Sequence, residues 1–157
     1  MEDNLCPPVL EPTAGRPDPR ALGGVDRIKC TIDVHAVLLT MTANSDFRPL
    51  QTRADFELAM ETSHLRPVVL FKHSNRCMTS ALAYRRMEAG RRPDDPPVFL
   101  LVVQQTQALA REIADSLKVR HESPQIIVLR EGSVLFHTSH ASVSPEAVRE
   151  VVAAQVR

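Results

Sequence analysis

Two short runs of consecutive apolar residues, at residues 67–71 and 97–103, constrain the fold of this chain more than any other feature. Runs of this length without alternating polar residues are typical of strands buried on both faces, as in parallel sheets covered by helices. Each run is followed by a segment in which apolar residues recur at helical spacing. The pattern therefore predicts an α/β protein in which crossover helices connect parallel strands.

The helical segments are placed by their apolar faces and capping residues. Thr52-Arg53-Ala54-Asp55 resembles a helix N-cap, and the face behind it consists of Phe56, Ala59 and Met60. A second helix is expected from Cys77 to about Gly90, and its apolar positions are Met78, Ala81, Leu82, Tyr84 and Met87. A third helix opens at Thr106, with an apolar side made of Leu109, Ala110, Ile113, Ala114 and Leu117.

The C-terminal part of the chain predicts a β-hairpin and a last helix. Strands are expected at Gln125–Leu129 and Val134–His137, with a turn at residues 130–133 between them. Ser144-Pro145-Glu146 is a strong helix start, and that helix would bury Val148, Val151, Val152 and Val156. With a short edge strand at Phe47–Gln51, the expected domain spans residues 46–157. It would be a central mixed sheet of four to five strands flanked by helices on both faces.

Residues 1–45 differ from the rest of the chain in composition. They hold five of the twelve prolines and three of the five glycines, and they show little sustained periodicity. We expect a mostly disordered N-terminal extension. Translation starting at Met41, which would make the first 40 residues an artefact of gene assignment, and a genuine flexible tail both remain open. The N-terminus begins with acidic residues and shows no secretory signal pattern.

Charge and cysteine content narrow the class of partner and the compartment. A formal net charge of zero provides no field that would favour nucleic acid or an anionic membrane, and no apolar run approaches a membrane span. Three widely spaced cysteines, Cys6, Cys30 and Cys77, argue against a disulfide framework and for a reducing compartment, the cytoplasm. A role for Cys6 or Cys30 in resolving a disulfide on Cys77 is not favoured.

Cys77 stands where the first buried strand gives way to a helix. Unpaired N–H groups and the positive end of the helix dipole would stabilise a thiolate there, and His73 and Arg76 could add positive charge. The residue three positions after Cys77 is Ser80, so the motif is Cys-x-x-Ser. Such a site can form a mixed disulfide but cannot close a local one.

Other polar residues near the motif have plainer interpretations. Lys72 is expected to be a solvated charge at a strand end. Ser80 either caps or packs within the first helical turn, or it hydrogen-bonds the sulfur. No cysteine–histidine cluster has zinc spacing, so no metal is expected. Three histidines are therefore interpreted as loop residues rather than metal ligands: His121, His137 and His140.

Together these residues resemble the monothiol bacilliredoxins, a YtxJ-like family of the thioredoxin superfamily. The similarity extends from about Phe47 to the C-terminus. It rests on Phe71-Lys72-His73-Ser74, Cys77, Ser80, Val119, His121-Glu122-Ser123-Pro124-Gln125 and His137-Thr138-Ser139-His140. Two positions depart from the family's pattern. Met78 stands where the family usually has proline, and Ala141 stands where an aromatic residue often follows.

The resemblance implies a thioredoxin-like fold and a thiol-disulfide oxidoreductase with Cys77 as the catalytic thiol. The candidate supporting residues are Lys72, His73, Ser74, Arg76 and Ser80. Ser123 and Pro124 would bind substrate, with Pro124 as a cis-proline that faces Cys77. No bound cofactor is implied. The co-substrate would be bacillithiol or a similar low-molecular-weight thiol, and the partners would be S-thiolated client proteins.

Three functions remain open from the sequence. The leading hypothesis is removal of the small thiol from protein mixed disulfides by Cys77. The alternative is a non-catalytic thioredoxin-like binding module, in which Cys77 is a redox sensor or inert and a partner segment lies beside Pro124. A third interpretation is an iron–sulfur carrier, which would need a dimer and external thiols because each chain offers one such cysteine.

Overall fold

The computed structural model describes residues 47–155, which form a five-stranded sheet, four α-helices and one short 3-10 helix. The strands are β1 (Arg48–Pro49), β2 (Val68–His73), β3 (Val98–Val102), β4 (Gln125–Arg130) and β5 (Ser133–Ser139). The helices are α2 (Arg53–Leu65), α3 (Met78–Ala89), α4 (Gln107–Leu117), η1 (His140–Ser142) and α5 (Pro145–Ala154). The predicted extension, with Met41, Cys6 and Cys30, and the predicted core position Val156 lie outside the described residues.

The sheet is mixed, as the sequence predicts. Its strand order is β1-β3-β2-β4-β5. The pairs β1–β3 and β2–β3 are parallel, whereas β2–β4 and β4–β5 are antiparallel. Parallel neighbours require a crossover, and α3 supplies it between β2 and β3. The terminal antiparallel pair is the predicted hairpin. The predicted fold class, an α/β mixed sheet with helices on both faces, is confirmed.

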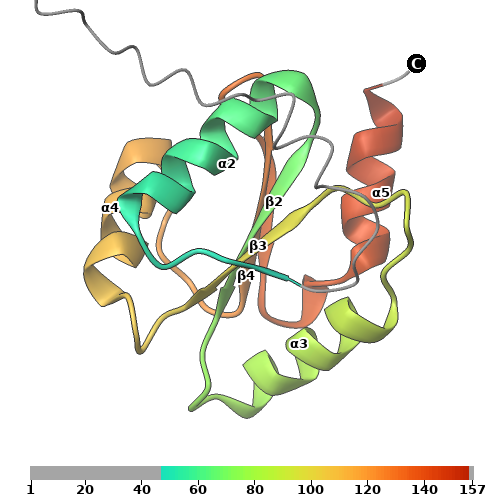
Figure 1. The fold of residues 1–157 in the computed structure, drawn as a ribbon. Helices are drawn as coiled ribbons and strands as arrows, with labels where there is room; N and C mark the ends of the chain where they lie inside the picture. Colours follow the sequence, from blue (N-terminus) through green and yellow to red (C-terminus); the bar gives the residue numbers. More distant parts are fainter. Residues whose placement is uncertain (1–46, 156–157) are drawn as a thin grey trace, which may run out of the picture. The chain divides into compact units, whose positions relative to one another are not determined.

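Alternating residues of the central strands supply two apolar cores, one on each face of the sheet. Val68 and Leu70 pack with residues of α2 and α4, whereas Val69 and Phe71 pack with residues of α3 and α5. Figure 1 shows this division, with α2 and α4 on one side of the sheet and α3 and α5 on the other. This arrangement explains why β2 reads as a continuous apolar run, because both of its faces are covered.

The apolar face predicted for α3 is partly wrong. Met78 is 77% exposed and Leu82 is 55% exposed. The residues that α3 buries are Ser80, Ala83 and Met87, which are spaced i, i+3 and i+7. At 100° per residue, Met78 and Leu82 lie on the opposite side of this helix from that stripe. The side of α3 that faces the sheet is therefore narrower and less apolar than the sequence suggests.

Candidate active site

Three loops meet at one end of the sheet, where β2 and β3 end and β4 begins. Parallel strands β2 and β3 end together, with His73 opposite Val102, and each runs into a loop. Antiparallel β4 begins at the same edge, because Lys72 lies opposite Gln125. The loop that carries Cys77, the loop after β3 and the loop that ends in Ser123-Pro124 are thus brought to one end of the sheet by strand register alone. The carboxyl ends of parallel strands are a common location for binding sites in open α/β sheets.

Cys77 is the N-cap residue of α3. Its backbone is extended (φ −123°, ψ 121°), and its carbonyl accepts the first helical hydrogen bond from the N–H of Ala81 at 3.0 Å. The side chain is partly exposed, and the thiol makes no capping hydrogen bond. A helix start without a side-chain cap leaves N–H groups of the first turn free to stabilise a negative charge.

These N–H groups lower the pKa of the Cys77 thiol. The backbone N–H of Ser80 is the largest cause, partial burial opposes it, and the N–H and hydroxyl of Thr79 add to the lowering. Neither His73 nor Arg76 is among the causes of this lowering. Burial lowers the pKa of His73, and the side chain of Arg76 is exposed without an ion pair within residues 47–155.

The hydroxyl of Ser80 stabilises the loop that carries Cys77, residues 74–77, which we call the Cys77 loop. Ser80 is fully buried, and its Oγ accepts a hydrogen bond from the N–H of Ser74 at 2.8 Å. The same Oγ lies 2.9 Å from Nδ1 of His73, and the two are hydrogen-bonded. The hydroxyl is therefore used within the loop. Ser80 packs within the first helical turn, as one of its expected roles has it, and its hydroxyl bonds the loop instead of capping the helix or bonding the sulfur. His73 in turn packs against the rings of Phe71 and Tyr84, with centroids 6.1 Å and 5.2 Å away.

Gln104, which the sequence analysis missed, clamps the Cys77 loop from the loop after β3. Its Nε2 donates to Oγ of Ser74 at 2.6 Å, and its Oε1 accepts from the N–H of Asn75 at 3.1 Å. Its position in the sequence could have predicted this role. Gln104 comes directly after a buried strand that is predicted to be parallel to the strand before Cys77, so both residues must lie at the same sheet edge.

The expectation that Lys72 is a solvated charge at a strand end is wrong, because its side chain is buried. Strand β2 continues to His73, so Lys72 lies within the sheet with 0% of its surface exposed. Its side chain shares the α2/α4 side with Leu70 by strand alternation, and Nζ donates to Oε1 of Gln125 at 3.0 Å. Burial lowers the pKa of Lys72 to about 8, and the charge of Glu122 partly opposes this lowering.

The Ser123–Pro124 peptide bond is cis, as the resemblance implies. The carbonyl of Pro124 accepts a hydrogen bond from the N–H of His140 at 2.9 Å, and His140 has a left-handed backbone (φ 58°). Oγ of Ser123 is buried and has no hydrogen-bond partner within the described part of the chain. The register of β2 and β4 places this loop next to the end of β2.

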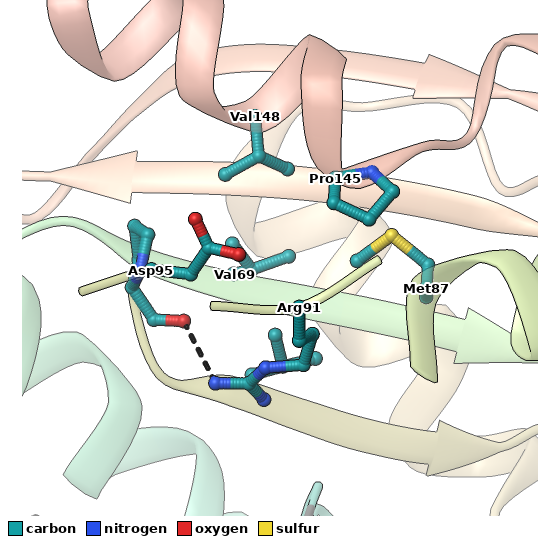
Figure 2. A pocket seen from close by; sticks show the side chains of 8 residues that line it. Val69, Met87, Arg91, Asp95, Pro145 and Val148 are labelled. Atoms are coloured by element: carbon teal, nitrogen blue, oxygen red, sulfur yellow. Dashed lines mark hydrogen bonds between the residues drawn. The ribbon is translucent and has the colours of Figure 1, made fainter. Parts of the chain in front are cut away.

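Other features of the described residues lie apart from this edge. Within residues 47–155, no three side chains of the metal-ligating types gather at one point, and no helix is long and apolar enough to cross a membrane. Figure 2 shows a small pocket on the α3/α5 side, where Arg91 donates to the carbonyl of Pro96 at 3.5 Å. Its volume is about 10 Å³, which is room for roughly one water molecule. Neither Cys77 nor Pro124 lines it.

Solved structures similar to this chain have the thioredoxin fold. One is a protein with a thioredoxin fold that is assigned as an oxidoreductase, 28% identical, with a TM-score of 0.60; the match covers 66% of this chain and 91% of that chain. A mutant thioredoxin from Halobacterium salinarum NRC-1 is 15% identical, with a TM-score of 0.57 and coverage of 74% and 96%. The thioredoxin of Trypanosoma brucei brucei is 17% identical, with a TM-score of 0.56 and coverage of 73% and 94%.

The sequence itself gives a narrower assignment than these structures do. A family profile described as monothiol bacilliredoxin BrxC matches residues 48–148, which include all five strands and the start of α5. The match contains the thiol at the start of α3, the buried Ser80 three residues later and the cis-proline loop. On this match, the chain belongs to the monothiol bacilliredoxin BrxC family, a group of thioredoxin-like thiol redox proteins.

Proposed function

We propose that this chain is a monothiol thiol-disulfide oxidoreductase in which Cys77 removes a low-molecular-weight thiol from protein mixed disulfides. The observation that carries the proposal is the uncapped start of α3, where backbone N–H groups lower the pKa of a partly exposed thiol. A lower pKa raises the thiolate fraction at neutral pH, and the thiolate is the attacking species.

Ser80 supports chemistry with one thiol. No second cysteine lies in residues 47–155, and the position that could have closed a local disulfide holds a hydroxyl engaged with Ser74 and His73. A disulfide formed on Cys77 therefore has no neighbouring thiol in this domain to resolve it. We propose that a thiol from solution resolves it, and not Cys6 or Cys30.

The reaction we propose has two exchange steps. The Cys77 thiolate attacks the small-thiol sulfur of the mixed disulfide, the disulfide bond breaks, and the client cysteine leaves as a thiolate that takes up a proton. Cys77 now carries the small thiol in a new disulfide. A second small-thiol molecule, as its thiolate, attacks that adduct, releases the Cys77 thiolate and leaves as the symmetric small-thiol disulfide. The client sulfur is reduced, the sulfur of the second small-thiol molecule is oxidised, and the chain is unchanged.

The family assignment supports bacillithiol, or a thiol of similar chemistry, as the small thiol. Both electrons in the proposed cycle come from that co-substrate, so the cycle requires no bound cofactor. We further propose that S-thiolated client proteins bind along the edge formed by Ser123 and Pro124, which the sheet register places beside the end of β2. The odd number of widely spaced cysteines favours the reducing cytoplasm as the compartment.

The test is transfer of a defined thiol. The full chain is incubated with peptides that carry bacillithiol, glutathione or cysteine on a single cysteine, and both products are followed by mass spectrometry. We expect a bacillithiol adduct on Cys77, release of the reduced peptide, and turnover when free bacillithiol is added. The Cys6→Ser/Cys30→Ser double variant is the matched control and should retain the activity.

Two results would contradict the proposal. If the parent chain releases no thiol from any of the three peptides, Cys77 belongs to a sensor or a binding module. If transfer persists in Cys77→Ser, the chemistry resides in Cys6 or Cys30. A faster reaction with the glutathione or cysteine peptide would change the identity of the small thiol and leave the reaction class unchanged.

A further inference from the structure

Lys72 is a buried cation without an acidic partner at ion-pair distance in the described part of the chain. Within the described residues, its ammonium donates a hydrogen bond to Oε1 of Gln125, a neutral amide, and both side chains are fully buried. The pKa of Lys72, about 8, still leaves the ammonium mostly protonated at pH 7. Burial of a charge without a carboxylate partner is costly. An apolar residue of similar length at this position would avoid that cost, so stability alone does not explain the lysine.

The ammonium fixes the orientation of the Gln125 amide. An ammonium group can only donate hydrogen bonds, so the amide must present Oε1 to Lys72 and direct Nε2 away from it. Nε2 then donates to the carbonyl of Arg120 at 2.9 Å. Arg120 lies in the loop between α4 and β4, which runs through Ser123 and Pro124 into β4. The Gln125 side chain thus joins Arg120 to the start of β4, and Lys72 holds that side chain at the C-terminal end of β2.

The opposite flank of the same loop is held by β5 and the residues after it. The N–H of His140 donates to the carbonyl of Pro124 at 2.9 Å, and Nε2 of His140 lies 3.9 Å from Oε1 of Glu122. Glu122 also interacts with the side chain of Ser139. All of these contacts come from the β5 side of the loop. On the β2 side, Lys72 bonds Gln125, and Gln125 bonds the loop at the carbonyl of Arg120.

We propose that Lys72 is a positioning residue that holds the Arg120–Pro124 loop in place as a binding edge for the mixed disulfide. This inference rests on the proposed function. It assigns Lys72 to substrate binding and not to activation of the thiol, since the groups that act on Cys77 are Ser80 and Thr79 in the first turn of α3. Lys72 makes no contact with substrate in this role and acts through Gln125.

The test replaces Lys72 with methionine, which keeps the length of the side chain and removes the charge and the donor. We expect Lys72→Met to melt close to the parent, because removal of a buried charge offsets the loss of the donor to the buried Oε1 of Gln125. The KM for a bacillithiolated peptide should rise roughly tenfold, the equivalent of one charged hydrogen bond. The kcat and the pH midpoint of Cys77 alkylation should stay close to the parent's. Leu70→Met, on the same face of β2, is the control for repacking.

Gln125→Glu tests separately the two hydrogen bonds of the Gln125 side chain, one with Lys72 and one with the carbonyl of Arg120. A glutamate at position 125 keeps an acceptor for Lys72 but cannot donate to the carbonyl of Arg120. We expect it to reproduce the KM defect of Lys72→Met, and the two changes combined should produce no larger defect than either alone. An unchanged KM in Lys72→Met would overturn the inference, as would a fall in kcat that tracks a fall in melting temperature.

A readout that does not use activity keeps this inference separate from the proposed function. Amide hydrogen exchange at His140, whose N–H bonds to Pro124, reports how firmly the loop is held. Lys72→Met should accelerate exchange at His140 and at residues 120–123, while the amide of Ser74 in the Cys77 loop stays protected. If the parent chain transfers no thiol, the proposed function fails and this pattern still tests the positioning role. Unchanged protection at His140 would overturn the role of Lys72 whatever the activity.

Discussion

The N-termini of α2 and α3 lie in one small domain and are built in opposite ways. At α2, Thr52 accepts a hydrogen bond from the N–H of Asp55, and the Asp55 carboxylate accepts from the N–H groups of Thr52 and Gln51, at 2.8 Å and 2.9 Å. At α3, Cys77 occupies the corresponding position and caps nothing. The first helix start satisfies its own N–H groups, whereas the second leaves them for the sulfur.

The two helix starts therefore have different roles. The start of α2 contributes to the stability of the domain, and the start of α3 contributes to the reactivity of the Cys77 thiol. A filled capping box stabilises a helix, and the N–H of Asp55 that it engages is not available to another anion. An N-cap cysteine loses that stabilisation, and the free N–H groups lower the pKa of its thiol instead. The two helix starts therefore predict opposite consequences of mutation. Changes at α2 should alter stability without altering exchange, and changes at the thiol of α3 should do the reverse.

The largest expected effect comes from Cys77→Ser. Thiol transfer should be abolished because no other cysteine thiol lies in residues 47–155. Serine is a preferred N-cap residue, so the helix start should be satisfied better than in the parent, and the melting temperature should stay equal or rise slightly. Transfer is measured with a thiolated peptide and stability by thermal unfolding. A clear fall in melting temperature would show that the sulfur is part of the packing, which would break the comparison.

The next largest effect is expected from Ser80→Ala. The hydroxyl lost is the partner of the Ser74 N–H and of His73, and a buried donor left unpaired costs about 1–3 kcal/mol of unfolding free energy. The backbone N–H of residue 80 remains, and it is the largest cause of the lowered pKa of Cys77.

Ser80→Ala should therefore unfold at a lower denaturant concentration and keep the parent's alkylation midpoint. A midpoint that rises to the ordinary cysteine value of about 8.5 would transfer the effect on the thiol from the backbone to the hydroxyl. Thr79→Ala, which removes an exposed side chain in the same turn, is the control for helix propensity in the unfolding measurement alone, because the Thr79 hydroxyl contributes to the lowered pKa of Cys77.

A smaller effect is expected from Thr52→Ala at the capped helix. Removal of the hydroxyl breaks the hydrogen bond from the N–H of Asp55 at 3.2 Å and its own bond to the Asp55 carboxylate at 2.9 Å. Loss of an N-cap costs about 0.5–2 kcal/mol of unfolding free energy. Thiol transfer should be unchanged, because α2 lies at a distance in sequence and packs on the other core from α3. Thr52→Ser should restore most of the stability. A change in transfer rate would show coupling between the two helix starts.

Features specified by neighbouring residues could be predicted from the sequence, whereas features that depend on distant partners could not. The cap at Thr52 follows from a four-residue pattern, and the location of Cys77 follows from a strand that ends just before a helix. Lys72 was misjudged because its burial depends on Gln125, which lies 53 positions further along the chain. The sequence places Met78 on the buried face because apolar residues occur on all sides of α3, so the stripe could be drawn through more than one set of positions.

The smallest effect is expected from Met78→Pro, which introduces the residue usual in the family at the first position of α3. The change should be tolerated. Cys77 already has the extended backbone that a following proline requires, proline is favoured at the first helical position, and 77% of Met78 is exposed. The fixed φ of proline would add about 0.4–1 kcal/mol of unfolding free energy at most.

Met78→Pro also tests which N–H groups act on the sulfur. The substitution removes the N–H of residue 78 and leaves those of Thr79 and Ser80, the two that lower the pKa of Cys77. The alkylation rate should therefore rise with pH through the same midpoint in the variant and the parent, below the ordinary cysteine value of about 8.5. A midpoint displaced upward in the variant would assign part of the stabilisation to the N–H of Met78. Methionine at this position would then be a gain of thiol acidity relative to the family's proline, and the uncapped helix start would act on the sulfur through its whole first turn.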